Sequence, residues 1–302
     1  MKCGAFFALL LAALLLGGCA GHKTRPRPAH GAPVAHAPGV STPYASEDDI
    51  SQPQDRRYRQ ARDGGPDGAH VDIASLPEPV PREEPRSRYG NKATYSVRGV
   101  TYHVLKSAEG YDERGIASWY GNKFHGYMTS NFEKYDMYKF SAAHKTLPLP
   151  SWARVTNLAN GKSVIVRIND RGPFVANRLI DLSYAAAVRI GIWPQGTGLV
   201  EVRAIDPAHP QELPPPPAVP VGGAHPGIWL QVGAFADVAN AARIAQQLER
   251  AGLAPVQVTD AVSGGRHVRR VRLGPLRDVG QADRVSAEVV RLGLPRPEVA
   301  VD

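Results

Sequence analysis

The residues of this chain best suited to chemistry are two carboxylates, Glu133 and Asp170, each set in a short polar run. Asp170 belongs to Asn-Asp-Arg-Gly-Pro-Phe (169–174) and follows a β-rich segment, so a strand would deliver its carboxylate to a turn. The loop that carries Glu133 can face this turn. Two carboxylates across a cleft are the minimal apparatus for breaking a glycosidic bond. The sequence therefore predicts a glycan-cleaving cleft.

The two carboxylates are expected to differ in role. An oxygen that leaves a sugar must be protonated, and a glutamic acid whose pKa is raised by desolvation and by a nearby carboxylate can do this. Glu133 is the predicted acid. Asp170, kept ionised by backbone donors or by Arg171, could stabilise the developing oxocarbenium charge. The plain alternatives are a solvated loop residue at position 133 and a turn cap at position 170.

Further polar side chains are candidates for the same cleft. His144 is either a substrate contact or carboxylate orienter, or a helix-face histidine bonded to the backbone. His125, in Phe-His-Gly, is a rim contact or a structural residue. Asp136 and Arg171 are candidates to bind substrate or to support the carboxylates.

Aromatic residues are candidates for contacts with sugar rings. Trp119 and Tyr120 could stack on a sugar, although aromatic residues of a barrel strand more often belong to the core. The same two residues are β-rich in context, so a strand is expected to carry them.

Several other kinds of site are not indicated. The 10 His residues show no metal-ligand spacing and no Gly-rich phosphate loop is present, so no metal or cofactor is predicted. The 2 Cys residues, at positions 3 and 19, leave no cysteine nucleophile in the mature chain. A formal charge of +8 could suggest nucleic acid, but an exported chain meets anionic cell-wall polymer instead. We therefore expect no nucleic-acid partner.

The N-terminus is a predicted export signal. Lys2 supplies a positive charge, and the apolar stretch 5–16, of about 12 residues, is short for a membrane span. It ends in Leu-Gly-Gly-Cys, which resembles a bacterial lipobox with Cys19 as the first mature residue. The resemblance implies acylation of Cys19, and two or more acyl chains give stable anchoring. No Asp follows Cys19, so we expect the outer membrane rather than the inner one. An ordinary secretory signal with a chance cysteine is the alternative.

Composition divides the chain into two folded domains and two linkers. Residues 1–18 are the signal, and residues 19–93, rich in Pro, Gly, His and Arg, are predicted to be a disordered linker anchored at Cys19. Such a coil of roughly 70 residues spans about 45–50 Å. Residues 94–206 and 226–302 are the predicted domains, and the Pro-rich stretch 207–225 is a semi-rigid spacer.

The first domain is predicted to be a small β-barrel with one or two short helices. Asn160-Gly161 is a strong hairpin signal between two of its strands. A helix is expected over Asp181–Ile190 with Asp181 as its N-cap. The expected strands are Ile116–Tyr120, Arg154–Asn157, Ser163–Ile168 and Leu199–Ile205.

The second domain has a different pattern, β-α-β-β-α-β, which is a split βαβ arrangement of the α+β class. Helices are expected over Val238–Ala251, ended by Gly252, and over Gln281–Leu292. The expected strands are Ile228–Phe235, Pro255–Val262, His267–Leu273 and Pro297–Val301.

Three blocks carry a family resemblance: Gly-Ile-Ala-Ser-Trp-Tyr-Gly (115–121), Ala-Ala-His-Lys-Thr-Leu-Pro (142–148) and Val-Arg-Ile-Asn-Asp-Arg-Gly-Pro-Phe (166–174). Over about Tyr95–Ala204 the chain resembles the double-psi β-barrel of the rare lipoprotein A family of peptidoglycan lytic transglycosylases. The resemblance implies that Glu133 and Asp170 are the essential carboxylates and that His144 is linked to activity. It also implies a reaction without water, in which the muramic 6-hydroxyl attacks its own anomeric carbon and leaves a 1,6-anhydro end.

One residue departs from this family. Where the family usually has Thr-Ala-Asn-Gly-Glu, this chain has Thr-Ser-Asn-Phe-Glu (129–133). Glycine there permits a positive φ that phenylalanine adopts only at a cost. Phe132 therefore predicts a reshaped loop or a new platform for a sugar.

The second domain resembles the SPOR domain, a peptidoglycan-binding module, through Trp-Leu-Gln-Val-Gly-Ala-Phe (229–235) and Val-Arg-Leu-Gly-Pro (271–275). The resemblance implies binding to glycan strands stripped of stem peptides, enrichment at the division septum, and septal-ring proteins as partners. Gln231 and Arg272 are the candidate glycan contacts, because an amide and a guanidinium can bond sugar hydroxyls and lactyl carboxylates.

The sequence thus predicts an outer-membrane-anchored lytic transglycosylase on the periplasmic side, with denuded peptidoglycan strands as its partner. Two alternatives stay open: a non-catalytic wall-binding lipoprotein, and an expansin-like module that loosens the wall without cleaving it.

Overall fold

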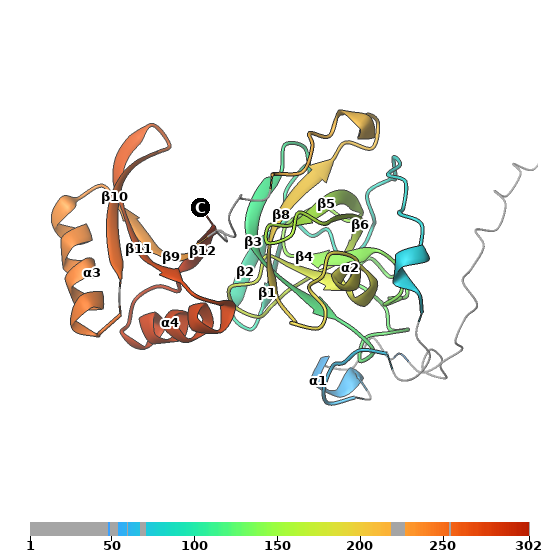
Figure 1. The fold of residues 1–302 in the computed structure, drawn as a ribbon, viewed down its shortest axis with the longest axis horizontal. Coiled ribbons are helices and arrows are strands. Elements are labelled where there is room, and N and C mark those ends of the chain that lie inside the picture. Colours follow the sequence, from blue (N-terminus) through green and yellow to red (C-terminus); the bar gives the residue numbers. More distant parts are fainter. Residues whose placement is uncertain are drawn as a thin grey trace, which may run out of the picture. The chain divides into compact units, whose positions relative to one another are not determined.

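The computed structural model describes Asp48 and residues 54–58, 60–66, 71–218, 227–253 and 255–301. The export signal and Cys19 lie outside the described residues. Two folded domains follow one another along the chain (Figure 1). Within the described part, no helix has both the length and the apolar character needed to cross a bilayer.

Six of the described strands close into a barrel, as predicted, in the order β3-β7-β4-β6-β5-β8. The β3–β7 and β4–β6 pairs are parallel and the other pairs are antiparallel. The strands are β3 (Asp112–Tyr120), β4 (Ser141–His144), β5 (Ser151–Asn157), β6 (Ser163–Asp170), β7 (Ile180–Ser183) and β8 (Gly198–Ile205).

The barrel closes because alternate residues of its strands are apolar and point inward. In β6, Val164, Val166 and Ile168 are fully buried, whereas the residues between them are partly exposed. The predicted strand ended at Ile168, and the observed one runs on to Asp170. The same alternation therefore carries the polar residues of β6 toward the outer face and the rim.

The short helix α2 (Tyr184–Arg189) follows β7, and its N-cap is Ser183, whose hydroxyl accepts a hydrogen bond from Ala186 N. The prediction of Asp181 as N-cap was therefore wrong. Asp181 lies inside β7, which is held between β3 and β4. Pairing with strands distant in sequence overrides the local helix signal.

The N-terminal strap, residues 71–93, packs against the barrel, so the prediction of disorder was wrong for this stretch. Its 3₁₀ turn η2 (Ile73–Ser75) buries Ile73 to 4% exposure in the barrel core. Arg189 Nη2 donates to the carbonyls of Ile73 and Leu76, and Trp152 Nε1 donates to the Arg82 carbonyl. The predicted domain boundary near residue 94 is thus too late by about two dozen residues.

Smaller elements flank the strap. They are α1 (Gln54–Arg57), the hairpin β1 (Thr94–Val97) with β2 (Val100–His103), and the 3₁₀ turn η3 (Pro210–Glu212) in the predicted spacer. Asp63 also joins the barrel, because its carboxylate accepts hydrogen bonds from Gly121 N (2.8 Å) and Lys123 N (3.1 Å). Part of the predicted linker upstream of the strap is therefore also in contact with the barrel.

The second domain has the predicted β-α-β-β-α-β order and forms one antiparallel sheet, β10-β11-β9-β12. Both helices pack on one side of this sheet (Figure 1), where Leu230, Leu248 and Leu273 are at most 1% exposed. Its elements are β9 (Ile228–Phe235), α3 (Val238–Arg250), β10 (Val256–Ser263), β11 (Arg266–Leu276), α4 (Val279–Arg291) and β12 (Glu298–Val301).

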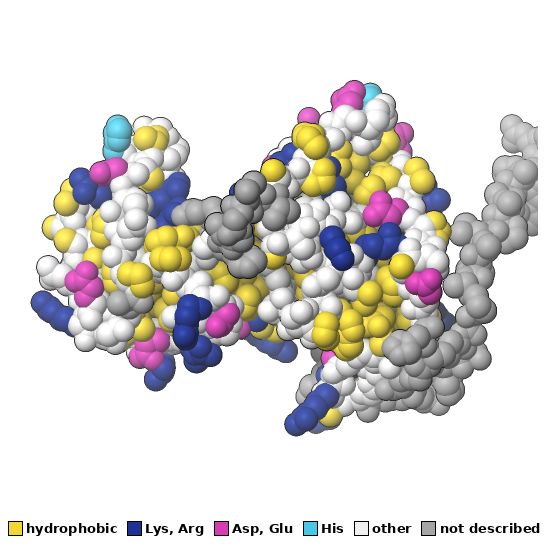
Figure 2. Space-filling view, in the orientation of Figure 1, with side chains coloured by type: hydrophobic (Ala, Val, Ile, Leu, Met, Phe, Trp, Pro, Cys, Tyr) yellow, Lys and Arg dark blue, Asp and Glu magenta, His cyan; other side chains and the backbone are white. Residues whose placement is uncertain are grey.

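The surface charge is mixed. On the face shown in Figure 2, basic and acidic side chains are interspersed over both domains.

Candidate active site

Asp170 ends β6 and fastens the neighbouring loop to the barrel. Its Oδ1 accepts hydrogen bonds from Ser130 N (2.8 Å), Ser130 Oγ (2.6 Å) and Arg171 N (2.8 Å). Among the described residues, none donates to its other oxygen, Oδ2. Burial raises the pKa of Asp170 and outweighs these hydrogen bonds, which lower it. Oδ2 can therefore carry a proton while Oδ1 stays an acceptor.

The Glu133 loop, residues 128–134, is tightly closed. Met128 and Lys134 form an antiparallel bridge at its base. Inside it, Thr129 N donates to the Glu133 carbonyl (2.8 Å) and Phe132 N donates to the Thr129 carbonyl (2.9 Å). Because Asp170 holds Ser130 of the same loop, the position of Glu133 is coupled to Asp170.

The Glu133 carboxylate rests on two residues of β6. Arg167 Nη1 donates to Oε2 (2.6 Å) and Nη2 to Oε1 (2.9 Å), while Asn169 Nδ2 donates to Oε2 (3.1 Å). Its side chain is 42% exposed. Burial alone would raise the pKa of Glu133, but the hydrogen bonds from Arg167 and Asn169 lower it overall. The prediction of a raised pKa at Glu133 was therefore wrong.

Arg167 also binds a second carboxylate, that of Glu84 in the strap. Its Nε and Nη2 donate to Glu84 Oε1 (2.9 Å) and Oε2 (2.8 Å). The Arg167 and Glu84 side chains are each 18% exposed. Burial lowers the pKa of Arg167, but its bonds with Glu84 and Glu133 raise it overall, so the guanidinium stays charged. We call Glu84, Arg167 and Glu133 the carboxylate cluster.

Asp170 and Glu133 thus form a pair of carboxyl groups with opposite pKa shifts at one end of the barrel. Groups whose environments push their pKa values apart can act as acid and base in one reaction. A metal would need more ligands than this pair offers. In the described part of the chain, no three His, Cys, Asp or Glu side chains are grouped to hold one.

Comparison with known proteins agrees with this geometry. A family model described as "Lytic transglycolase" matches residues 112–204, and a SPOR domain model matches residues 224–297. The protein named endolytic peptidoglycan transglycosylase RlpA from Pseudomonas aeruginosa (strain UCBPP-PA14) is 38% identical over 94% of this chain and 93% of its own length. This chain belongs to the RlpA family. Its barrel is accordingly a lytic transglycosylase domain.

Two further matches concern single parts of this RlpA-family chain. The relative of the same name from Vibrio cholerae serotype O1 is 51% identical over 49% of this chain and 56% of its own length. A crystal structure of the RlpA SPOR domain from Pseudomonas aeruginosa is 31% identical, covers 24% of this chain and 97% of that chain, and has a TM-score of 0.24.

His144 lies in β4 of the RlpA-family barrel, not on a helix, and is only 2% exposed. Its Nδ1 accepts hydrogen bonds from Thr146 N (3.2 Å) and Leu147 N (3.0 Å), so the ring proton is on Nε2, 2.8 Å from Tyr111 Oη. Burial lowers the pKa of His144 to about 3, which keeps it neutral. The structure therefore corrects only the predicted helix location, and the link of His144 to activity stays a prediction.

The Arg171 guanidinium is occupied by contacts within the protein. Its guanidinium donates to the carbonyls of Gly90 (2.8 Å), His144 (3.0 Å) and Leu147 (2.5 Å), and to Asn91 Oδ1 (3.2 Å). Burial lowers the pKa of Arg171 to about 10. Of the two alternatives predicted for the Asp170 carboxylate, backbone donors or Arg171, the structure shows backbone donors, and the Arg171 guanidinium is not among them.

The two aromatic candidates of β3 occupy different places. Tyr120 is 7% exposed and stacks on Tyr135, with ring centroids 4.1 Å apart, so its ring belongs to the core and has no face for a sugar. Trp119 is partly buried and meets Trp193 edge to face at 4.9 Å. Alternation along β3 explains why neighbouring side chains separate in this way.

His125 and Asp136 stabilise their own segment. His125 Nδ1 accepts a hydrogen bond from Met137 N (3.2 Å), and Asp136 Oδ1 accepts one from Tyr138 N (3.0 Å). The two side chains lie 3.8 Å apart, and burial lowers the pKa of His125 more than Asp136 raises it. No bond joins either of them to Glu133 or Asp170 within the described residues.

Phe132 adopts the positive φ that its position in the loop requires, at 66°. Its side chain is 45% exposed and its ring lies 4.1 Å from the ring of Tyr89, in the strap. The loop thus keeps a conformation that favours glycine, instead of being reshaped to suit phenylalanine.

Asp181 is a third carboxyl group that the sequence analysis missed as a site residue. In the strand pairings Ala143 lies opposite Asp170 on one side and Asp181 on the other. Ser118 Oγ donates to Asp181 Oδ1. Burial raises the pKa of Asp181 to about 6. The alternation Ile-Asp-Leu (180–182), with both apolar residues buried, is the signal that could have identified a strand there.

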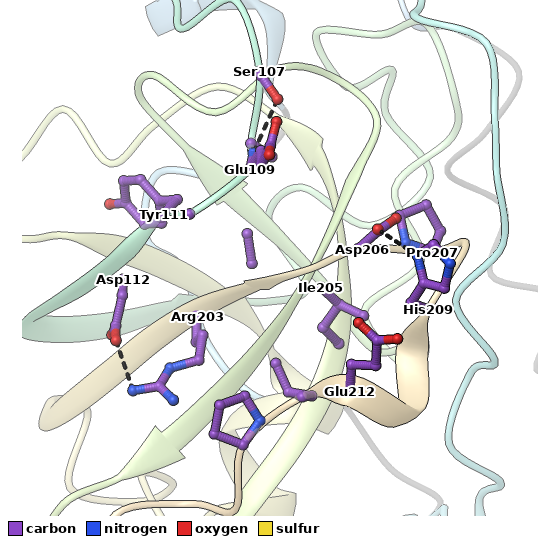
Figure 3. A pocket seen from close by; sticks show the side chains of 15 residues that line it. Ser107, Glu109, Tyr111, Asp112, Arg203, Ile205, Asp206, Pro207, His209 and Glu212 are labelled. Atoms are coloured by element: carbon purple, nitrogen blue, oxygen red, sulfur yellow. Dashed lines mark hydrogen bonds and ion pairs between the residues drawn. The ribbon is translucent and has the colours of Figure 1, made fainter.

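A surface pocket of about 570 Å³ lies elsewhere on the barrel, between the start of β3 and the end of β8 (Figure 3). Asp112 and Arg203 form an ion pair of 2.6 Å at its wall, and Asp206 and His209 form one of 3.0 Å. Neither Glu133 nor Asp170 lines it. The carboxyl pair thus lies outside this pocket.

In the second domain, Gln231 and Arg272 are direct partners across β9 and β11. Their neighbours Leu230 and Leu273 are buried under the helices, so both polar side chains point to the helix-free face. The structure thus brings these two candidates together.

Proposed function

We propose that this chain cuts within peptidoglycan strands, at the bond between N-acetylmuramic acid and N-acetylglucosamine, and leaves 1,6-anhydro ends. The observation that carries the proposal is the link through Ser130, which fixes the Glu133 loop to Asp170 and so holds two unlike carboxyl groups together. The printed name of the relatives, endolytic peptidoglycan transglycosylase, supports the substrate and the internal cut.

The opposite pKa shifts favour Asp170 as the acid and Glu133 as the base, whereas the sequence predicted Glu133 as the acid and Asp170 as an ionised stabiliser of the oxocarbenium charge. The Asp170 proton passes to the bridging oxygen while the bond from that oxygen to the muramic C1 breaks, and the electron pair leaves with the glucosamine hydroxyl. The muramic O6 then bonds to C1, and Glu133 takes the proton from O6. This proton returns to Asp170 through solvent, so no water is consumed.

Two isosteric variants test the reaction. Glu133→Gln and Asp170→Asn are each expected to reduce 1,6-anhydro products by at least about a hundredfold, the scale of general acid–base catalysis. Mass spectrometry of digested sacculi measures the products, and Glu83→Gln, at an exposed strap position, is the control. Equal product release by the parent and both variants would contradict the proposal. Absence of products from the parent would favour a non-catalytic or expansin-like wall module.

We propose further that the second domain directs the enzyme to glycan stripped of stem peptides, which gathers at the division septum. The helix-free sheet face with Gln231 and Arg272 supports this, because an open face suits an extended polymer. The SPOR domain model that matches residues 224–297 supports the same assignment of the domain. Septal localisation of a fluorescent fusion, lost on removal of residues 226–302, is the expected outcome.

We also propose a lipid anchor at Cys19 that holds the chain at the periplasmic face of the outer membrane. The support is the Leu-Gly-Gly-Cys run and the lack of Asp at position 20. Cys19→Ala is expected to leave the protein out of the outer-membrane fraction. Unchanged fractionation, with no lipid-modified N-terminal peptide in the parent, would contradict the anchor.

A further inference from the structure

The carboxylate cluster contains one residue from outside the barrel. Arg167 and Glu133 lie within residues 112–204, which the transglycosylase family model matches, whereas Glu84 comes from the strap. The motifs that identify the catalytic carboxyl groups do not include Glu84. Glu84 nevertheless contacts Arg167, and Arg167 in turn contacts Glu133, so a strap residue is linked to Glu133 through one side chain.

The guanidinium of Arg167 is divided between the two carboxylates. Nε faces Glu84 and Nη1 faces Glu133, at 2.9 and 2.6 Å. Nη2 donates to both, at 2.8 and 2.9 Å. A planar guanidinium has donors in fixed directions, so a carboxylate held on one edge fixes the edge offered to the other. Moving or neutralising Glu84 must therefore change the orientation of the Arg167 donors that face the Glu133 carboxylate.

We propose that Glu84 is a positioning residue for Glu133. Glu84 acts through the shared Arg167: it fixes the orientation of the Glu133 carboxylate, and it partly neutralises the positive charge of Arg167 that Glu133 faces. This inference rests on the proposed function only for its effect on catalysis. With Glu84 in place, Glu133 stays basic enough to accept the proton of the muramic 6-hydroxyl. With Glu84 neutral, Arg167 would hold the ionised Glu133 more firmly and weaken it as a base.

The charged groups around Glu133 set the direction of the effect. Arg167 and Asp170 belong to β6, Lys134 to the Glu133 loop, and Glu84 to the strap, where Arg82 lies 3.8 Å from it. Removing the negative charge of Glu84 stabilises the ionised form of Glu133, so its pKa falls. The neutral asparagine at 169 keeps its hydrogen bond in both cases.

The test is a carboxyl carbon NMR titration of the purified full-length chain, with the Glu133 signal assigned by its loss in Glu133→Gln. In Glu84→Gln we expect the midpoint of Glu133 to fall by about one pH unit, the scale of one nearby charge. In Glu83→Gln, the exposed neighbour, no shift is expected. An unchanged or raised midpoint in a folded Glu84→Gln variant would overturn the proposal.

Arg167→Lys is an independent variant if Glu84→Gln does not fold. A single ammonium cannot hold both carboxylates on paired donors, so the midpoint of Glu133 should rise. A midpoint that stays at the parent value there would also overturn the proposal. When Glu84→Gln is combined with Arg167→Lys, it should shift the titration midpoint of Glu133 by less than it does alone, because the coupling between the two carboxylates runs through the guanidinium.

Activity gives a separate readout. In Glu84→Gln the acidic limb of the pH–rate profile should move to lower pH, and the plateau kcat should fall about threefold as the base weakens, with KM unchanged. Glu84→Asp, which keeps the charge, should recover most of the rate. If the parent makes no anhydro products while the titration behaves as expected, the proposed function fails and the role of Glu84 stands.

Discussion

At the residue scale, Phe132 is the departure whose energetic cost can be measured. It holds φ at 66°, in the left-handed region, and its ring lies against Tyr89. A non-glycine residue in that region costs about 1–2 kcal/mol. The loop tolerates the cost because Asp170 fixes Ser130 two residues before it.

Comparing Phe132→Gly with Phe132→Ala isolates this backbone cost, because both variants lose the ring. We expect the Gly variant to be more stable than the Ala variant by about 1 kcal/mol in urea unfolding. Val175 is the control position, because it is an exposed loop residue that does not have a positive φ. There the Ala variant should be more stable than the Gly variant. An Ala variant at position 132 as stable as the Gly variant would contradict the argument.

The sequence predicts Glu133 and Asp170 as the catalytic carboxyl groups, because short motifs mark them, and this role stays a prediction. The side-chain hydrogen-bond partners of the two groups were not predicted. Arg171 follows Asp170 directly, yet its side chain turns to the carbonyls of residues 90, 144 and 147, and Arg167 binds Glu133 instead. Which guanidinium meets which carboxylate depends on strand alternation and on loops far apart in sequence.

At the scale of elements, the strap decides how the barrel is completed. Most strands, and the order of the second domain, were predictable from alternation and turn residues. β4, β7 and the strap were not. β4 and β7 are four-residue strands whose pairings are entirely long-range, and the strap has the Pro-rich composition of a linker. Its two buried residues, Ile73 and Pro81, are too sparse a signal for a periodic pattern.

We therefore expect Ile73→Ala to destabilise the barrel by about 2 kcal/mol, at the low end for a buried isoleucine because the strap can partly relax. Thermal unfolding followed by tryptophan fluorescence measures the change. Val80 also lies in the strap, but it is 78% exposed. Val80→Ala should therefore change the stability by less than about 0.5 kcal/mol. Equal effects at both sites would show that the strap does not complete the core.

At the scale of the whole molecule, the chain joins a cutting domain to a binding domain, each with its own core. Contacts of an open sheet face with a polymer are individually weak, because they replace water. Affinity should therefore grow with the number of sugars engaged, and the binding domain can hold the enzyme near a strand between cuts.

Residues 226–302 alone should then co-sediment with sacculi treated with an amidase and much less with untreated sacculi. Arg272→Ala should weaken this binding about tenfold, the scale of a lost charged hydrogen bond. Arg269→Ala is the matched control, because Arg269 is paired with Asp260 at 2.7 Å and lies on the same face of β11 as Val271 and Leu273, opposite to the face of Arg272. Equal binding to both kinds of sacculi, or to neither, would contradict the targeting role.

Closure of the barrel also bears on how the protein behaves at high concentration. A strand at the edge of a sheet offers unpaired N–H and C=O groups to other chains, and a closed ring has no such edge. The second sheet, by contrast, ends at β10, where Val258 and Val262 are 40% and 59% exposed. We expect any edge-to-edge aggregation of this protein to begin at β10, and a charged residue in place of Val262 to improve its solubility without affecting the barrel.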